Sequence, residues 1–170
     1  MLQLPDITAY MALLLAVLPI CAWVCWSDLK TMKIPNKAVI ATVVVFAVVG
    51  FTVMRTEVWA WRWLHLVVVL VIGFVLNAIA GVGAGDAKFA AAAAPFIAYQ
   101  HLPLVLPLFA AFLLGAFFGH RILRAIPAVR NMTPDWVSWT RKDFPMGLAL
   151  AGTLVAYLAL MTYGASLPAS

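Results

Sequence analysis

The feature that most constrains this chain is a succession of six apolar runs that are separated by polar stretches. A transmembrane helix needs about 20 predominantly apolar residues, and inside a bilayer it can satisfy its own backbone hydrogen bonds. We therefore expect about six transmembrane helices, of which the fourth is short. The runs cover residues 7–26, 38–54, 64–80, 86–99, 104–119 and 146–163.

The composition excludes a soluble globular domain. Of the 170 residues, 66% are hydrophobic and only 10% are charged, whereas soluble domains carry about 25% charged residues. The sequence predicts an all-α, polytopic membrane protein, with residues 1–170 forming a single domain in the lipid bilayer. The first run is expected to be retained as a span, because no basic segment of the kind found in signal peptides precedes it.

The basic residues lie in short loops, a pattern that sets membrane orientation and does not indicate nucleic-acid binding. With six spans, nine basic residues fall on one side and two, Arg55 and Arg62, on the other. We expect the first side to face the cytoplasm and both termini to lie outside. The nine are Lys30, Lys33, Lys37, Lys88, Arg121, Arg124, Arg130, Arg141 and Lys142.

Metal and cofactor chemistry have no sequence signal. Cys21 and Cys25 lie four residues apart in the first run, which places them on one helical face as small buried hydrophobes. No CxxC pair is present, and the three histidines are scattered without ligand spacing. We predict no metal site and no cofactor.

Two acidic residues, Asp28 and Asp86, lie at membrane edges on the predicted cytoplasmic side. Asp135 and Asp143 share that side but belong to the polar stretch between the last two runs. A carboxylate costs about 2.5–3.5 kcal/mol at the centre of a membrane helix and less near its edge, so such residues are functional candidates. The alternative is structural: Asp86 would be the N-cap of the fourth helix, and Asp28 an ordinary loop residue.

Two carboxyl groups held close together cannot both ionise at low cost, so the pair shares one proton over a range of pH. The ionised member can take a proton from water while the protonated member polarises an amide carbonyl. Gly81, Gly83 and Gly85 precede Asp86, and we expect them to allow positive φ and the approach of an extended substrate backbone. The sequence does not show whether the two carboxyl groups are close.

Three segments resemble a known family. Gly83-Ala84-Gly85-Asp86-Ala87-Lys88 resembles the GxGDxK signature of the membrane aspartyl peptidases that cleave type IV prepilins. Asp28 followed by Lys33-Ile34-Pro35-Asn36 resembles the second signature of these enzymes. Phe144-Pro145-Met146-Gly147 resembles their FPxGP stretch, with Leu148 in place of the last proline. We expect that departure to affect the packing of the last helix and not the two aspartates.

The resemblance implies that Asp28 and Asp86 are the catalytic pair of an aspartic endopeptidase. It implies cleavage after the short basic leader of a pilin-like precursor, at the cytoplasmic face of a bacterial inner membrane, with pilus assembly machinery as a further partner. The cysteine tetrad segment of the bifunctional members is missing, so the chain resembles the short, peptidase-only type of tight-adherence (Flp) pili. The substrate-binding residues that we expect are Gly83, Gly85, Lys88, Pro35 and Asn36.

Other interpretations remain open at this point. Lys88 is either a hydrogen-bond donor to the pair or substrate, or an interfacial lysine whose stem lies along the membrane. The whole chain could instead be a small proton-coupled transporter that uses Asp28 and Asp86 as a relay, although relay carboxylates usually lie near the midplane. A structural assembly subunit without chemistry is a third interpretation, in which both aspartates are dispensable.

Overall fold

The computed structural model of the chain describes residues 6–141 and 143–164, and all regular elements in these ranges are helical. The predicted all-α membrane fold is confirmed. Lys142, counted above among the basic residues, lies outside the described residues. The elements are α1 (Asp6–Thr31), α2 (Asn36–Val45), a π-helical segment η1 (Phe46–Gly50), α3 (Phe51–Val53), α4 (Thr56–Ala80), α5 (Ala84–Ala93), η2 (Ala94–Phe96), η3 (Tyr99–His101), α6 (Leu102–Ala125), α7 (Pro127–Met132), η4 (Val137–Trp139) and α8 (Gly147–Gly164).

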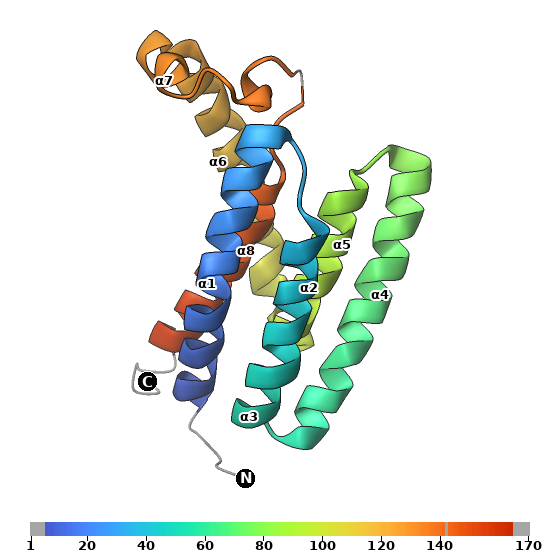
Figure 1. Cartoon of the computed structure of the whole chain (residues 1–170). Coiled ribbons are helices and arrows are strands. Elements are labelled where there is room, and N and C mark those ends of the chain that lie inside the picture. Colours follow the sequence, from blue (N-terminus) through green and yellow to red (C-terminus); the bar gives the residue numbers. More distant parts are fainter. Residues whose placement is uncertain (1–5, 142, 165–170) are drawn as a thin grey trace.

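Within the described ranges, five stretches are long and apolar enough to cross a membrane. The predicted fourth span is only the ten-residue helix α5, which passes into a 3₁₀ turn that contains Pro95. Proline has no backbone N–H to continue the helical hydrogen bonds. Successive runs still alternate in direction (Figure 1), as a six-run topology requires. The five candidate spans are Ile7–Thr31, Asn36–Val53, Thr56–Ala80, Tyr99–Ala125 and Gly147–Gly164.

Two helix boundaries differ from the sequence expectation. Helix α1 continues to Thr31, so Asp28 belongs to its last turns and not to a loop. Helix α4 begins at Thr56, eight residues before the start of the predicted third run. Charged and aromatic residues at a membrane interface are compatible with helical backbone, so the hydropathy pattern ended the first run too early and began the third run too late.

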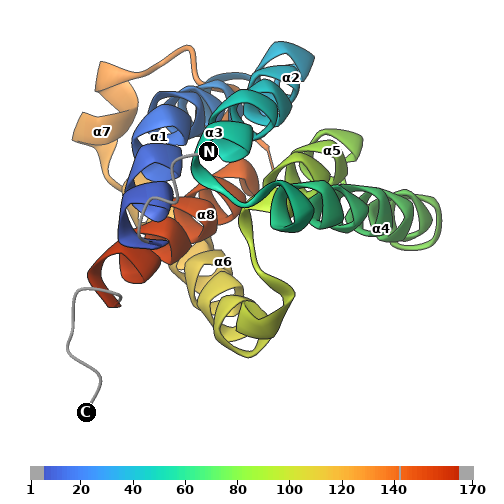
Figure 2. The same ribbon diagram turned by 90° about the horizontal axis from the view of Figure 1, so that it is seen from below.

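The helices form two groups (Figures 1 and 2). Helix α8 lies along α1 and also packs against α6, while α4 and α5 form a pair beyond α2. The buried core lies mainly between α1 and α8. It includes Leu13, Val17, Val24, Leu154, Tyr157 and Leu158, each with no more than 1% of its surface exposed. Helix α4 instead exposes large apolar side chains along most of its length, as a lipid-facing helix does.

Two contacts hold α5 against α4. A Cβ added at Gly73 of α4 would lie 2.9 Å from the Cβ of Ala87, so the absence of a side chain lets the helices approach closely. At the other end of α5, the buried guanidinium of Arg62 donates from Nη1 to the carbonyl oxygens of Pro95 (3.3 Å) and Phe96 (2.9 Å). Arg62, counted above as an interfacial cation, is therefore a buried anchor for the turn after α5.

The segment between α6 and α8 folds back over the end of α1. Trp136 contacts Trp26 of α1 edge to face, with ring centroids 5.3 Å apart, and stacks on Trp139 at 5.5 Å. Lys30 of α1 pairs with Asp135 at 3.2 Å, although both side chains are largely exposed. These contacts fix the path of the chain as it returns to the first turn of α8.

Candidate active site

Asp28 is buried, with 4% of its surface exposed, on the last turns of α1. Its Oδ2 accepts a hydrogen bond of 2.6 Å from the backbone N–H of Gly147, the first residue of α8. The partner that holds this carboxyl group thus comes from a helix that begins 119 residues later in the chain. No ion pair to Asp28 is present among residues 6–141 and 143–164.

The chain turns sharply after α1. Met32 has a φ of 54°, in the left-handed region that non-glycine residues seldom adopt, and its N–H donates to the carbonyl of Asp28 at 2.8 Å. The hydroxyl of Ser27 donates to the carbonyl of Lys33 at 3.0 Å, which closes the turn. Ile34, in the middle of this turn, is buried. The turn leads directly into α2, which begins at Asn36.

Asp86 is the third residue of α5 and is half-buried. The alternative interpretation of Asp86 as the N-cap is wrong: Gly83 precedes the first helical residue, and no side chain caps this helix. Asp86 still lies in the first turn, where the helix dipole favours a negative charge. Burial raises the pKa of Asp86 to about 6, and the nearby charge of Asp28 contributes to the shift.

Asp28 and Asp86 lie at the same end of the molecule, one at the end of α1 and the other at the start of α5. A negative charge on one carboxyl group disfavours ionisation of a neighbouring one, which is the direction in which Asp28 acts on the pKa of Asp86.

The positive φ expected for the glycines before Asp86 is found at one of the three. Only Gly81, which ends α4 with a φ of 67°, has a positive φ among the glycines that the structure describes. Gly83 has a φ of −55°, and a Cβ there would collide with Oδ2 of Asp86. A Cβ at Gly85 would lie 3.5 Å from the Cβ of Ile34. Gly83 thus makes room for the carboxyl group, and Gly85 packs against the Lys33–Asn36 turn.

The other predicted substrate-binding residues lie on α5 and at the start of α2. Lys88 is exposed on α5, two residues beyond Asp86. Pro35 precedes α2, and its carbonyl accepts hydrogen bonds from Ala38 and Val39 at 2.9 and 3.2 Å. Asn36 is exposed at the first position of α2. Their contact with a substrate remains a prediction.

Gly147 is the site residue that the sequence analysis missed. It is buried, and a Cβ there would lie 2.8 Å from Oδ2 of Asp28 and 3.2 Å from the Cβ and Cγ of that residue. The resemblance of Phe144-Pro145-Met146-Gly147 to the family stretch was the available signal, although no site role was predicted for Gly147. The start of α8 contacts Asp28 through this residue.

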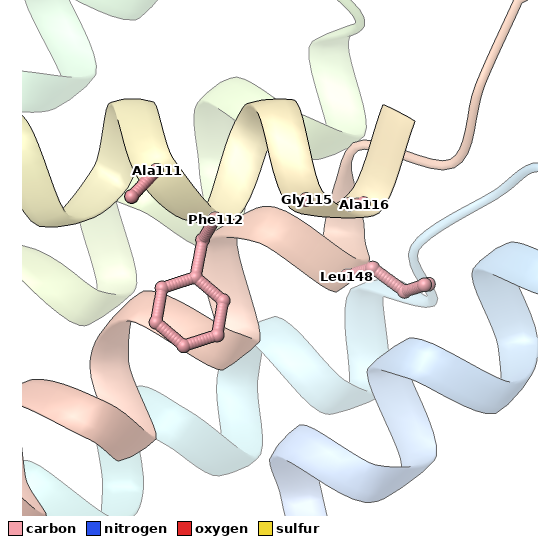
Figure 3. A pocket seen from close by; sticks show the side chains of 5 residues that line it. All are labelled: Ala111, Phe112, Gly115, Ala116 and Leu148. Carbon is pink, nitrogen blue, oxygen red and sulfur yellow. The ribbon is translucent and has the colours of Figure 1, made fainter. Parts of the chain in front are cut away.

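A separate apolar hollow of about 450 Å³ lies between α6 and the start of α8 (Figure 3). Leu148 borders it from α8, immediately after the residue that binds Asp28. Its lining contains neither aspartate and no polar side chain, so it offers no acid–base chemistry. Its lining residues are Ala111, Phe112, Gly115, Ala116 and Leu148. In the part of the chain that the structure describes, no three His, Cys, Asp or Glu side chains gather as metal ligands.

Comparison with known protein families gives a match over most of the chain. The family model described as the type IV leader peptidase family matches residues 13–120, a range that contains Asp28, the Lys33–Asn36 turn and Asp86. No curated protein and no solved structure matches the chain. The matched range covers more than half of the 170 residues. The chain belongs to the type IV leader peptidase family.

Proposed function

We propose that this protein is an aspartic prepilin peptidase whose catalytic residues are Asp28 and Asp86. The observation that carries the proposal is the convergence of three signature segments on these two carboxyl groups. Gly85 of the first packs on Ile34 of the second, and Gly147 of the third binds Asp28. Structural contacts between these segments do not require two carboxyl groups, whereas peptide hydrolysis of the aspartic type uses both of them.

The proposed reaction adds water across one peptide bond. The ionised carboxyl group takes a proton from water as the oxygen bonds to the carbonyl carbon, while the protonated carboxyl group stabilises the developing charge on the carbonyl oxygen. The C–N bond then breaks, and the leaving amine takes up the proton that water gave. The products are one carboxylic acid and one amine, and both carboxyl groups return to their initial states.

The family supports a prepilin substrate and a multi-pass protein of the bacterial inner membrane. We propose that the bond after a short basic leader is cut at the cytoplasmic face, with Gly83, Gly85, Lys88, Pro35 and Asn36 along the substrate path. The end of the molecule that carries both aspartates also carries most of the basic residues, which supports a cytoplasmic location. The tight-adherence subtype and the pilus assembly machinery as partner belong to the same proposal.

The first test is substitution of each aspartate by alanine, with the size of a co-expressed prepilin read on a gel. We expect Asp28→Ala and Asp86→Ala each to lower processing by at least about 10²-fold, because removal of a catalytic acid or base costs about 10²–10⁴. The matched control is Asp143→Ala, since Asp143 is an exposed aspartate in the segment before α8. Wild-type processing by either active-site variant would contradict the assignment.

The transporter interpretation has no support in the family match. A structural subunit without chemistry would tolerate both alanine variants and would leave the prepilin uncut even in the wild type. Purified protein with a synthetic prepilin in detergent distinguishes this case, because a peptidase must release the leader without other components.

A further inference from the structure

We propose that Gly147 is a positioning residue that keeps Asp28 ionised, and that Asp28 is therefore the general base and Asp86 the proton-bearing acid. This inference rests on the proposed function, because it assigns roles within the same carboxyl pair.

The two carboxyl groups have unequal surroundings. Asp28 is nearly fully buried, yet its Oδ2 accepts the 2.6 Å hydrogen bond from Gly147. The donor is the first residue of α8, so the positive end of the helix dipole also points at this oxygen. A hydrogen bond to the charged form favours the carboxylate. Because Asp86 also lies in the first turn of a helix, the bond from Gly147 is what distinguishes Asp28 from Asp86. Asp86 accepts no such bond among the contacts that the structure describes.

Other charges do not reverse this difference. Lys30, two residues after Asp28, pairs with Asp135. Lys88 of α5 is exposed and forms no ion pair with either aspartate in the described ranges. Cys25 lies three residues before Asp28 on the same helix. The charge of Asp28 in turn acts on Asp86 and helps to retain its proton.

The same geometry explains why residue 147 is a glycine. A Cβ at position 147 would lie 2.8 Å from Oδ2 of Asp28 and 3.2 Å from its Cγ. Gly147 and Asp28 are both buried, so a side chain at position 147 would lengthen or break the hydrogen bond. Only a glycine at this position lets the amide reach the carboxylate.

The assignment fixes each proton transfer. Asp28 takes a proton from water as the C–O bond forms, and Asp86 donates its proton to the carbonyl oxygen. On breakdown of the tetrahedral intermediate, Asp28 gives its proton to the departing nitrogen, and Asp86 recovers its proton from the hydroxyl group. The productive state is ionised at Asp28 and protonated at Asp86, so kcat/KM should fall above about pH 6, as Asp86 loses its proton.

The test compares Gly147→Ala with Gly119→Ala, because a Cβ at Gly119 of α6 would contact nothing within 4 Å. For Gly147→Ala we expect a lower kcat and an acidic limb of the kcat/KM profile that moves up by about one pH unit, since the carboxylate form of Asp28 loses its donor. Gly119→Ala should keep the wild-type rate and profile. A slow Gly147→Ala enzyme with unmoved limbs would overturn the proposal, because a purely structural defect lowers the rate alone.

A second measurement covers the case in which Gly147→Ala does not fold. Infrared difference spectra between about pH 5.5 and 7.5 detect protonated carboxyl groups, while exposed carboxyl groups are already ionised in that range. We expect a signal in the wild-type protein that disappears in Asp86→Asn. A signal that persists in Asp86→Asn would place the proton on Asp28 and overturn the assignment. The spectra need no substrate, so they test the proton assignment separately from the proposed function. If the spectra are as expected but the protein does not cleave prepilin, the proposed function is refuted and the proton assignment stands.

Discussion

At the scale of single residues, the site depends on glycines that leave space for carboxyl groups. Gly83 lies where a side chain would collide with Oδ2 of Asp86, and Gly147 lies where one would contact Asp28. Neither residue has a positive φ, so conformational freedom is not the reason for glycine. The reason is steric: each aspartate has a backbone segment directly against its carboxyl oxygen.

Gly83→Ala tests this steric role. Alanine readily adopts the φ of −55° and ψ of 128° found at this position, so the backbone should keep its conformation while the Cβ displaces the carboxyl group of Asp86. We expect kcat/KM for prepilin cleavage to fall about 10- to 100-fold, because small misplacements of a catalytic group have effects of this size. The control Gly115→Ala adds a Cβ that meets nothing within 4 Å. Equal rates for Gly83→Ala and wild type would show that Asp86 does not need its present position.

At the scale of elements, α5 places Asp86 although it is too short to be a candidate span. Its first turn carries Asp86, its middle packs through Ala87 on Gly73 of α4, and its end continues into the turn held by Arg62. A short helix contributes little stability by itself, so tertiary contacts must hold it. Arg62 donates hydrogen bonds to the carbonyl groups of two buried residues in that turn.

Arg62→Ala should destabilise the protein by roughly 2–4 kcal/mol, because both carbonyl groups lose a charged donor. Thermal unfolding in detergent measures the effect as a lower Tm. The matched control is Arg55→Ala, whose side chain is exposed and pairs only with the exposed Glu57 at 3.1 Å. Exposed ion pairs contribute about 0–1 kcal/mol, so the control should unfold near the wild-type temperature. Equal Tm values for the two variants would contradict the anchoring role.

At the scale of the whole molecule, the alternating helices bring the ends of α1, α5 and α8 to one side (Figure 1). The start of α4, with Glu57, lies at the opposite end, while Asp143 lies just before α8 at the end that carries the aspartates. The proposed orientation therefore predicts opposite exposure of these two positions across the membrane.

Cysteine labelling checks the orientation. In a background with Cys21→Ala and Cys25→Ala, we expect a membrane-impermeant maleimide to label Glu57→Cys in intact spheroplasts. Asp143→Cys should react only after lysis, because nine basic residues favour a cytoplasmic location for that end. The exposed side chains of Glu57 and Asp143 make both positions accessible to the reagent. The reverse labelling pattern would refute the cytoplasmic active site.

Hydropathy predicted the helical membrane fold but not the helix ends. Asp28, Lys30 and the tryptophans at the start of α4 look like loop residues by hydropathy, yet they are helical. The alanine run of α5 looks like a span, yet it gives way to a 3₁₀ turn around Pro95. The apolar content of a segment indicates whether the segment prefers lipid to water. The residue at which a helix ends depends instead on local hydrogen bonds and on contacts with other helices.

By itself, the sequence determined that the chain is helical and membrane-bound, and that Asp28 and Asp86 stand out among six acidic residues. In lipid, backbone groups without hydrogen bonds and charged side chains are both costly. The helical membrane fold and the unusual aspartates can therefore be predicted from the composition and from the positions of charges along the chain. Only the tertiary structure decided that Asp28 and Asp86 come to the same end of the molecule and that Gly147 binds Asp28. Those contacts join segments from α1, α5 and α8, and their distances depend on how the helices pack.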